Sequence, residues 1–285
     1  MKPFPLVSVG MPIFNEERFL RASLDALTEQ DYVNIEIIIS DNASTDHSET
    51  ICRDYAERFA HVTYHRFAEN KGPGPNFAHV LKQARGEFFM WASGHDLWAP
   101  NYLSSCVDAL TRHEDAVLAF GTSKWIDENG VTLTKESGWT DTRGMDVVAR
   151  YITVLWGNMH PILGLIRTAP LREVPFINMV GADLVILTRL ALQGDFVHSP
   201  LTNWSRREFR NETTFTEKLS RYKNTSYRVV TARWEKLFPL ARLPLALVRN
   251  VLSADLPITD KTLIMALLVP CFPIRYITGR RYRAR

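Results

Sequence analysis

Residues 7–16 read Val-Ser-Val-Gly-Met-Pro-Ile-Phe-Asn-Glu, a mostly apolar segment that ends in two polar side chains. The run from Val7 to Ile13 is typical of a buried β-strand. Apolar residues then recur at helical spacing, which predicts a helix directly after the strand: Phe19, Leu20, Leu24 and Leu27. A buried strand followed at once by a helix is the repeating unit of a parallel α/β sheet.

The same alternation continues to about residue 121. Further strands are predicted at residues 35–39, 62–66, 88–92 and 116–121, with helices at 48–59, after 76 and around 103–110. The pattern then loosens into a predicted hairpin turn at 127–130, a helix at 145–156, a strand at 162–166 and a helix from Ala182. The sequence therefore predicts an α/β fold with a mostly parallel central sheet flanked by helices, whose ligands bind at the carboxyl ends of the strands.

Composition and charge restrict the class of protein. The chain has 285 residues, of which 46% are hydrophobic and 23% charged, so it is a folded protein with one large α/β domain or two small ones. The net charge of +3 does not indicate a nucleic-acid-binding protein. The charge is unevenly distributed, because residues 236–285 hold nine basic and two acidic residues while residues 1–235 hold 25 basic and 29 acidic ones.

Cysteine spacing and hydropathy bear on the compartment. Cys52, Cys106 and Cys271 lie far apart and form no C-x-x-C pair, which indicates unpaired thiols in a cytosolic protein. The N-terminal residues lack the apolar core of a signal peptide. The longest apolar candidate, residues 262–274, is 13 residues long and contains two prolines, so we expect no membrane-spanning helix and a cytoplasmic location.

Polar clusters follow three of the predicted strands. Asn15 and Glu16 follow the first, Asp41 and Asn42 the second, and residues 93–96 (Ser-Gly-His-Asp) the strand at 88–92. Each cluster alone could be an ordinary turn or helix cap. Their joint placement at one edge of the predicted sheet favours a binding site.

These segments carry a resemblance to a known family. Residues 11–16 (Met-Pro-Ile-Phe-Asn-Glu), 40–46 (Ser-Asp-Asn-Ala-Ser-Thr-Asp), 70–72 (Asn-Lys-Gly) and 94–100 (Gly-His-Asp-Leu-Trp-Ala-Pro) resemble the successive signatures of family 2 glycosyltransferases of the A-type fold. The resemblance covers roughly residues 5–215 and implies a Rossmann-like fold. It also implies a catalytic domain at 1–221, with a nucleotide-sugar-binding half at 1–122 and an acceptor-binding half at 123–221. A helical extension follows at 222–285.

The resemblance assigns the nucleotide-sugar site residue by residue. Asp41 matches the acidic residue that hydrogen-bonds the base or ribose, and Asn42 follows it in the same motif. Pro12 and Phe14 would line the same pocket through their backbone, with Glu16 nearby. Lys71 lies in the Asn-x-Gly turn, where its charge suits the diphosphate.

The block that usually binds a divalent cation departs from the family pattern. Ser93 and His95 stand where relatives carry aspartates, whereas Asp96 matches the acidic residue that follows and is also a candidate substrate-binding residue. The expectation is that His95 and Asp96 hold Mn²⁺ or Mg²⁺ beside the diphosphate. The alternative is that His95 lies in a polar turn and that a basic side chain such as Lys71 neutralises the diphosphate.

The second half should supply a general base and contacts to the substrates. Asp183, in a segment that resembles the family's Glu-Asp motif, is the expected base; alternatively it is simply an acidic residue in the first turn of a helix. Arg206 and Arg207 are candidates to contact the diphosphate, and a solvated basic loop is the alternative. Trp156, His160 and Trp204 could stack on a sugar, although large aromatic residues are more often core residues.

The resemblance implies an inverting glycosyltransferase. It would move a sugar from a nucleotide-diphosphate sugar, UDP-linked, to a glycan or lipid-linked acceptor in cell-surface polysaccharide synthesis. A sugar nucleotidyltransferase is the less favoured enzyme, because it would need a glycine-rich basic loop after the first strand. A non-catalytic nucleotide-sugar-binding protein is the other alternative, since His95 and Ser93 replace carboxylates.

The basic, apolar segment at 222–285 has two interpretations. It could lie on an anionic cytoplasmic membrane surface and place the protein beside a lipid-linked acceptor. It could equally be a pair of helices that packs on the domain and ends in a solvated basic stretch.

Overall fold

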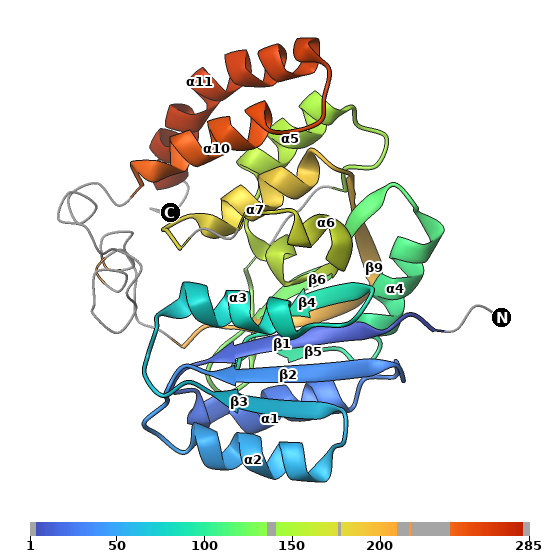
Figure 1. Ribbon diagram of the computed structural model, residues 1–285, viewed down its shortest axis with the longest axis vertical. Coiled ribbons are helices and arrows are strands. Elements are labelled where there is room, and N and C mark those ends of the chain that lie inside the picture. Colours follow the sequence, from blue (N-terminus) through green and yellow to red (C-terminus); the bar gives the residue numbers. More distant parts are fainter. Residues whose placement is uncertain are drawn as a thin grey trace.

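The computed structural model describes residues 4–135, 141–175, 178–209 and 240–281, together with Glu217 and Ser220 (Figure 1). A nine-stranded mixed sheet forms the centre of the molecule, in the order β3-β2-β1-β4-β8-β6-β9-β5, with β7 paired to β6. Helices cover both of its faces (Figure 1). The sheet and its covering helices confirm the predicted α/β class.

The first half builds the parallel part of the sheet. Its elements are β1 (Val7–Ile13), α1 (Glu17–Thr28), β2 (Ile35–Asp41), α2 (Ser48–Arg58), β3 (Val62–Arg66), α3 (Pro73–Gln83) and β4 (Phe88–Trp91). Strand β1 is parallel to both β2 and β4, and β2 is parallel to β3. The register places Ile13 beside Asp41, so the polar residues that follow β1 and β2 meet at one edge.

The second half adds antiparallel and parallel strands to the same sheet. Its elements are β5 (Leu97–Trp98), α4 (Tyr102–Arg112), β6 (Ala116–Ile126), β7 (Thr132–Leu133), α5 (Val147–Trp156), η1 (His160–Leu163), β8 (Leu165–Arg167), α6 (Thr168–Arg172), α7 (Ala182–Ala191) and β9 (Asp195–Arg207). Strand β8 is antiparallel to β4 and β6, whereas β9 is parallel to β6 and antiparallel to β5. The strand predicted at 162–166 starts later, because Pro161 favours the short η1 turn that precedes it.

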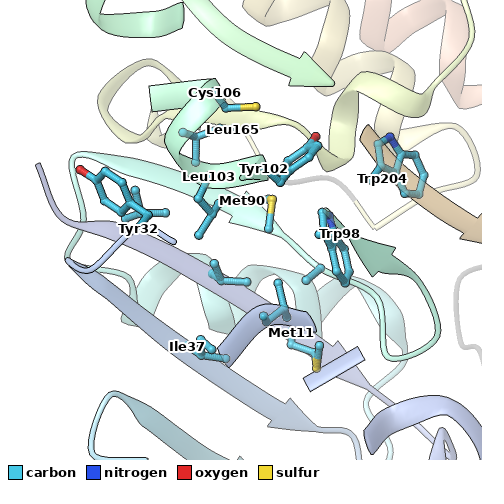
Figure 2. Packing of buried hydrophobic residues seen from close by; sticks show 14 of the residues in the cluster. Met11, Tyr32, Ile37, Met90, Trp98, Tyr102, Leu103, Cys106, Leu165 and Trp204 are labelled. Carbon is cyan, nitrogen blue, oxygen red and sulfur yellow. The ribbon is translucent and has the colours of Figure 1, made fainter. Parts of the chain in front are cut away.

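The core lies on the two faces of the sheet. Along β4, Phe88 and Met90 belong to the cluster beneath α1 and α4, while Phe89 and Trp91 belong to the cluster beneath α3 and α7. This alternation follows from the period of two in a strand, and it explains why β4 is apolar throughout. Figure 2 shows the first cluster, in which Met11, Met90, Trp98 and Tyr102 pack together.

Two further helices complete the described chain, α10 (Arg242–Leu252) and α11 (Ile258–Arg281). They pack on α5 and α7 in a third cluster that includes Leu243, Leu247, Ile264 and Leu268. Residues 242–252 and 258–281 are thus helical as predicted, while 222–239 and 282–285 of the predicted tail lie outside the described residues. None of the described helices is both long and apolar enough to span a bilayer.

Candidate functional site

The candidate site lies at the edge of the sheet where β1 and β2 end, the side to which their arrowheads point in Figure 1. The loops after these strands are joined by hydrogen bonds. The Asn15 main-chain N–H donates to Ser44 Oγ at 2.9 Å, and the Asn15 side chain accepts from the Thr45 N–H at 2.8 Å. Asn15 has a φ of 54°, a left-handed conformation that Asn tolerates better than most residues. The first and second polar clusters therefore form one rigid unit.

Asp41 is fully buried and both of its carboxylate oxygens have partners. Oδ1 accepts from the Ser44 N–H at 2.8 Å, and Oδ2 accepts from the Tyr64 hydroxyl at 2.8 Å. Arg66 Nε lies 3.5 Å from Oδ2 and pairs with Glu49 as well. Burial, followed by the hydrogen bond to Asp41, raises the pKa of Tyr64, so the hydroxyl remains a donor. Tyr64 and Arg66 thus hold Asp41 in one orientation.

Asn42 connects the second polar cluster to the Asn-x-Gly turn. Its Nδ2 donates to Asn70 Oδ1 at 2.9 Å, and its Oδ1 accepts from the Lys71 main-chain N–H at 2.8 Å. Its own N–H donates to the Ile13 carbonyl at 3.0 Å. The Lys71 side chain is exposed, and its ammonium lies 4.6 Å from the centre of the Phe67 ring. Asn42 therefore fixes the loop that presents the Lys71 charge.

Pro12 and Phe14, the two residues predicted to line the pocket through their backbone, are half-buried at the end of β1. Gly94 allows the loop after β4 to approach this strand end, because a Cβ there would lie 3.0 Å from Glu16 Cβ and Cγ. The approach brings Glu16 to the His95 imidazole, with Oε2 and Nδ1 3.0 Å apart. The structure thus joins Glu16 to the residues predicted to bind a cation.

Arg207 closes this part of the site from β9. Its main-chain N–H donates to Asp96 Oδ1 at 2.9 Å, and its Nε donates to the His95 carbonyl at 3.0 Å. Its Nη1 donates to the carbonyls of Asp127 at 3.0 Å and Glu128 at 3.2 Å. Arg207 is buried, and the Asp96 carboxylate beside it is 2% exposed. Arg207 therefore binds the protein itself and orients the turn that contains His95 and Asp96.

The residues present do not fit the divalent cation that the family resemblance led us to expect. Among the described residues, no group of three or more His, Cys, Asp or Glu side chains is placed to hold a metal ion. His95 Nδ1 faces Glu16, Asp96 Oδ1 is taken by Arg207, and His95 Nε2 lies 4.0 Å from Asp96 Oδ1. The buried guanidinium of Arg207 is also attracted by the charge of Asp96. We therefore derive no step through a cation.

Asp183 lies in the first turn of α7, where its side chain reaches solvent although protein surrounds it densely. The helix begins after Gly181, whose φ of 88° is left-handed and therefore suits glycine. Desolvation by the surrounding protein raises the pKa of Asp183, and the positive charge of Arg206 opposes that shift. Arg206 is the sequence neighbour of Arg207, and its guanidinium lies 4.8 Å from the centre of the Trp125 ring.

An aromatic group lies close to Arg206. His160 Nδ1 is 3.2 Å from Ser123 Oγ, and its ring contacts the edges of Trp125 and Trp204 at centroid distances of 5.5 and 5.9 Å. Burial and the Arg206 charge lower the pKa of His160 to about 4, so the imidazole is neutral at pH 7. Trp204 is 2% exposed and belongs to the core. Of the two possibilities given for this residue, stacking on a sugar or packing in the core, the structure shows the second.

The two parts of the site touch through a glycine. A Cβ on Gly74, near the start of α3, would lie 2.5 Å from Asn178 Oδ1. Asn178 precedes α7, the helix that carries Asp183. The first turn of α3 therefore packs on the segment that precedes α7.

The sequence analysis did not identify Tyr64, Arg66 or Trp125 as site residues. The first two could have been found from strand register, since a parallel β2–β3 pair places Arg66 directly beside Asp41. No comparable signal pointed to Trp125, because its role depends on the conformation of Arg206.

Comparison with known proteins adds a family and a fold. The family model described as glycosyl transferase family 2 matches residues 8–166. A glycosyltransferase of Rickettsia typhi, itself uncharacterized, is 31% identical over 130 residues, which cover 45% of this chain and 40% of the relative. An uncharacterized Mycobacterium tuberculosis protein is 35% identical over 120 residues, or 41% of this chain and 35% of that protein. The chain thus spans less than half the length of these relatives.

Two solved structures share the A-type fold. S. aureus TarS residues 1–349 in complex with UDP-GlcNAc matches with a TM-score of 0.69 at 20% identity, covering 93% of this chain and 72% of that one. A mannosyltransferase from Pyrobaculum calidifontis in complex with GDP-Man and Mn²⁺ matches with a TM-score of 0.59 at 18% identity, covering 99% of this chain and 85% of that one. At these identities the likeness concerns the fold.

Proposed function

The chain belongs to glycosyl transferase family 2, and from this premise we propose that it transfers a sugar from a UDP-linked donor to a hydroxyl of a glycan or lipid-linked acceptor, with inversion at the anomeric carbon. The observation that supports this proposal most directly is the set of contacts at the end of β9. There Arg207 binds the turn that contains His95 and Asp96, while the charge of its neighbour Arg206 acts on Asp183. One strand end therefore connects the proposed donor side to the proposed base.

The donor half comprises residues 1–122 in this proposal. Asp41 and Asn42, with the backbone of Pro12 and Phe14, form the nucleoside end of the pocket. Asp41 is fully buried and both of its oxygens accept hydrogen bonds from protein, so a nucleoside that binds Asp41 would replace one of these donors. The hydrogen bonds of Asn42 keep the neighbouring loop in place, and a preorganised pocket loses little conformational freedom on binding. A uridine nucleotide is favoured because one similar fold, TarS, was solved with UDP and with UDP-GlcNAc.

Asp183 acts as the general base in the acceptor half, residues 123–221. Its carboxylate takes the proton of the acceptor hydroxyl as that oxygen forms a bond to the anomeric carbon. The bond between the anomeric carbon and the diphosphate oxygen breaks in the same displacement, and the nucleoside diphosphate leaves with the electron pair. The raised pKa of Asp183 supports this role, because a more basic carboxylate is a better proton acceptor.

The charge that develops on the departing diphosphate is met by basic side chains in this proposal. Lys71 is exposed at the loop that Asn42 fixes, and Arg206 is exposed at the end of β9. Glu16, His95, Asp96 and Arg207 shape the floor of the donor side through their mutual hydrogen bonds. The cellular role proposed for this activity is the synthesis of a cell-surface polysaccharide.

The test is a transfer assay with the full chain and a panel of UDP-, GDP- and dTDP-linked sugars, in which release of the nucleoside diphosphate is measured with and without Mn²⁺. The expected result is release of UDP that depends on an added glycan or lipid-linked acceptor. UDP binding in calorimetry without turnover on any acceptor would instead favour the nucleotide-sugar-binding alternative. If no nucleotide binds, the donor site proposed at Asp41 and Asn42 is wrong.

A further inference from the structure

Between residues 262 and 274, helix α11 is apolar both on the side that the described residues cover and on the side that is exposed. Ile264 and Leu268 are buried at 0% and 5% exposure in the cluster formed with α5 and α10. On other sides of the helix, Ile258 is 76% exposed and Val269 is 73% exposed. A helix that is hydrophobic all round normally lies in a core or against another apolar phase.

Between residues 258 and 274, the residues of α11 that are exposed carry no charge. The exposed residues from 258 to 274 are all apolar or hydroxyl-bearing: Ile258, Thr259, Thr262, Leu263, Ala266, Val269, Pro270, Pro273 and Ile274. At a rise of 1.5 Å per residue this face is about 24 Å long. Solvent-exposed faces of helices in globular proteins are ordinarily polar.

Exposed apolar side chains are concentrated in this part of the molecule. Within the described residues, six of the eleven large hydrophobic side chains that are exposed belong to α10, α11 and the turn between them: Leu245, Leu252, Ile258, Leu263, Val269 and Ile274. Figure 1 shows α10 and α11 together at one end of the molecule, away from α1 and α2. We name these six exposed apolar side chains the α10–α11 surface.

Basic residues border this surface. Arg242, Leu245, Arg249 and Leu252 are exposed at positions three and four apart on α10, so arginine and leucine alternate along one face. In the sequence, residues 240–285 hold eight basic and two acidic residues, and five arginines follow Ile274. Both acidic residues, Asp255 and Asp260, precede the second turn of α11.

We propose that the α10–α11 surface lies on an anionic lipid bilayer, with α11 parallel to the membrane plane. Apolar side chains such as Leu263 and Val269 would enter the region between head groups and acyl chains, and the bordering arginines would contact lipid phosphates. Long arginine side chains can keep their charge at head-group level while their methylene groups lie in apolar surroundings.

A second copy of the chain fits this surface less well. A two-fold interface brings the same patch of both copies together, so the basic borders would face one another. Like charges at close range oppose such an association. In an anionic bilayer the acyl chains complement the apolar face and the phosphates complement its basic border, so a bilayer fits this surface better than a second copy does.

The experiment measures sedimentation of the full chain with vesicles of phosphatidylcholine alone or mixed with phosphatidylglycerol. We expect binding only to the mixed vesicles, weakened by added salt. The double substitution Leu263→Glu and Val269→Glu should weaken binding by about tenfold or more, because it removes apolar contacts and adds negative charge. Since both side chains are exposed, the variant should keep its unfolding temperature.

Two controls make the result specific. Val33→Glu places one glutamate on a side chain that is 80% exposed, between α1 and β2, and should leave vesicle binding unchanged. Arg242→Gln with Arg249→Gln should reduce the preference for anionic vesicles. The proposal is overturned if the wild-type chain binds neither vesicle, or if Val33→Glu weakens binding as much as the double substitution. It also fails if light scattering shows a dimer that the glutamates convert to a monomer.

Discussion

The main-chain N–H of Arg207 donates a hydrogen bond to Asp96 Oδ1 at 2.9 Å, and the Arg207 guanidinium returns to the carbonyl of His95, one residue earlier. These contacts join the end of β9 to the turn after β4, although the two residues are 111 positions apart. Because neighbouring side chains of a strand point to opposite sides, Arg206 is directed elsewhere, to Trp125 and toward Asp183. The two arginines should therefore respond very differently to substitution.

Arg207→Met should destabilise the protein far more than Arg206→Met. The first change leaves the carbonyls of His95, Asp127 and Glu128 without their side-chain donor in a buried site, which should cost about 2–4 kcal/mol of unfolding free energy. Arg206 is exposed and lies over the Trp125 ring, and its loss should change that free energy by about 1 kcal/mol or less. Urea unfolding at pH 7 measures both values. Equal losses would mean that Arg207 has no special structural role.

Asp183→Asn should reduce turnover without reducing donor affinity. If Asp183 removes the acceptor proton, an amide cannot replace it, and kcat should fall by about a hundredfold to ten-thousandfold. The UDP dissociation constant should stay unchanged, because Asp183 belongs to the acceptor half in our proposal. Calorimetry with UDP alongside the transfer assay separates the two effects. Full activity of this variant would exclude Asp183 as the base.

Arg206→Met should move the acidic limb of the pH profile. The Arg206 charge lowers the pKa of Asp183 against the larger effect of desolvation, so its removal should raise that pKa further. A base with a higher pKa is protonated at higher pH, and kcat/KM should therefore begin to fall at a higher pH than in the wild type. Arg112→Met, which removes a surface arginine paired with Asp108 on α4, is the matched control and should leave the profile unchanged.

The sequence was sufficient to predict the parallel half of the fold. The strand at Val7–Ile13 and the strand from Ile35 consist mainly of apolar residues, and the helices between them have a regular apolar face. Local pattern and tertiary burial agree there, which is why the predicted and observed elements coincide within a few residues. The polar residues that end these strands were also placed correctly at one edge, since parallel strands fix that geometry.

The longest strand was not predicted. Residues 195–207 form β9, but Pro200, Asn203 and two arginines interrupt any apolar alternation, and the register of its pairing with β6 shifts twice. Its existence depends on a partner some eighty residues earlier in the chain, which local sequence does not report. The same strand affects the predicted cation site. Arg207 lies on β9, and its main-chain N–H donates to Asp96 Oδ1, an atom that was expected to bind the cation.

Mn²⁺ should not strengthen binding of UDP. Glu16 is bound to His95, and the main-chain N–H of Arg207 donates to Asp96, so a divalent cation would have to displace existing protein contacts. We expect UDP dissociation constants measured by calorimetry with Mn²⁺ and with EDTA to agree within about twofold. A tightening of about tenfold or more in Mn²⁺, lost in Asp96→Asn, would restore the cation site that the family resemblance implied.

Glu36 should make the stability of the protein depend on pH. Burial alone would raise its pKa, but hydrogen bonds from the Ser8 hydroxyl and from the Arg85 main chain and guanidinium outweigh burial, and the pKa is lowered. A lowered folded pKa contributes stability that is complete above the unfolded value near 4.5 and is lost as pH falls through the folded value. Glu36→Gln should thus cost about 1–3 kcal/mol at pH 7 and progressively less at pH values below that unfolded value. Thermal unfolding across this pH range measures the difference, with exposed Glu57→Gln as the control; a cost that stays constant with pH would show that the Glu36 charge contributes nothing.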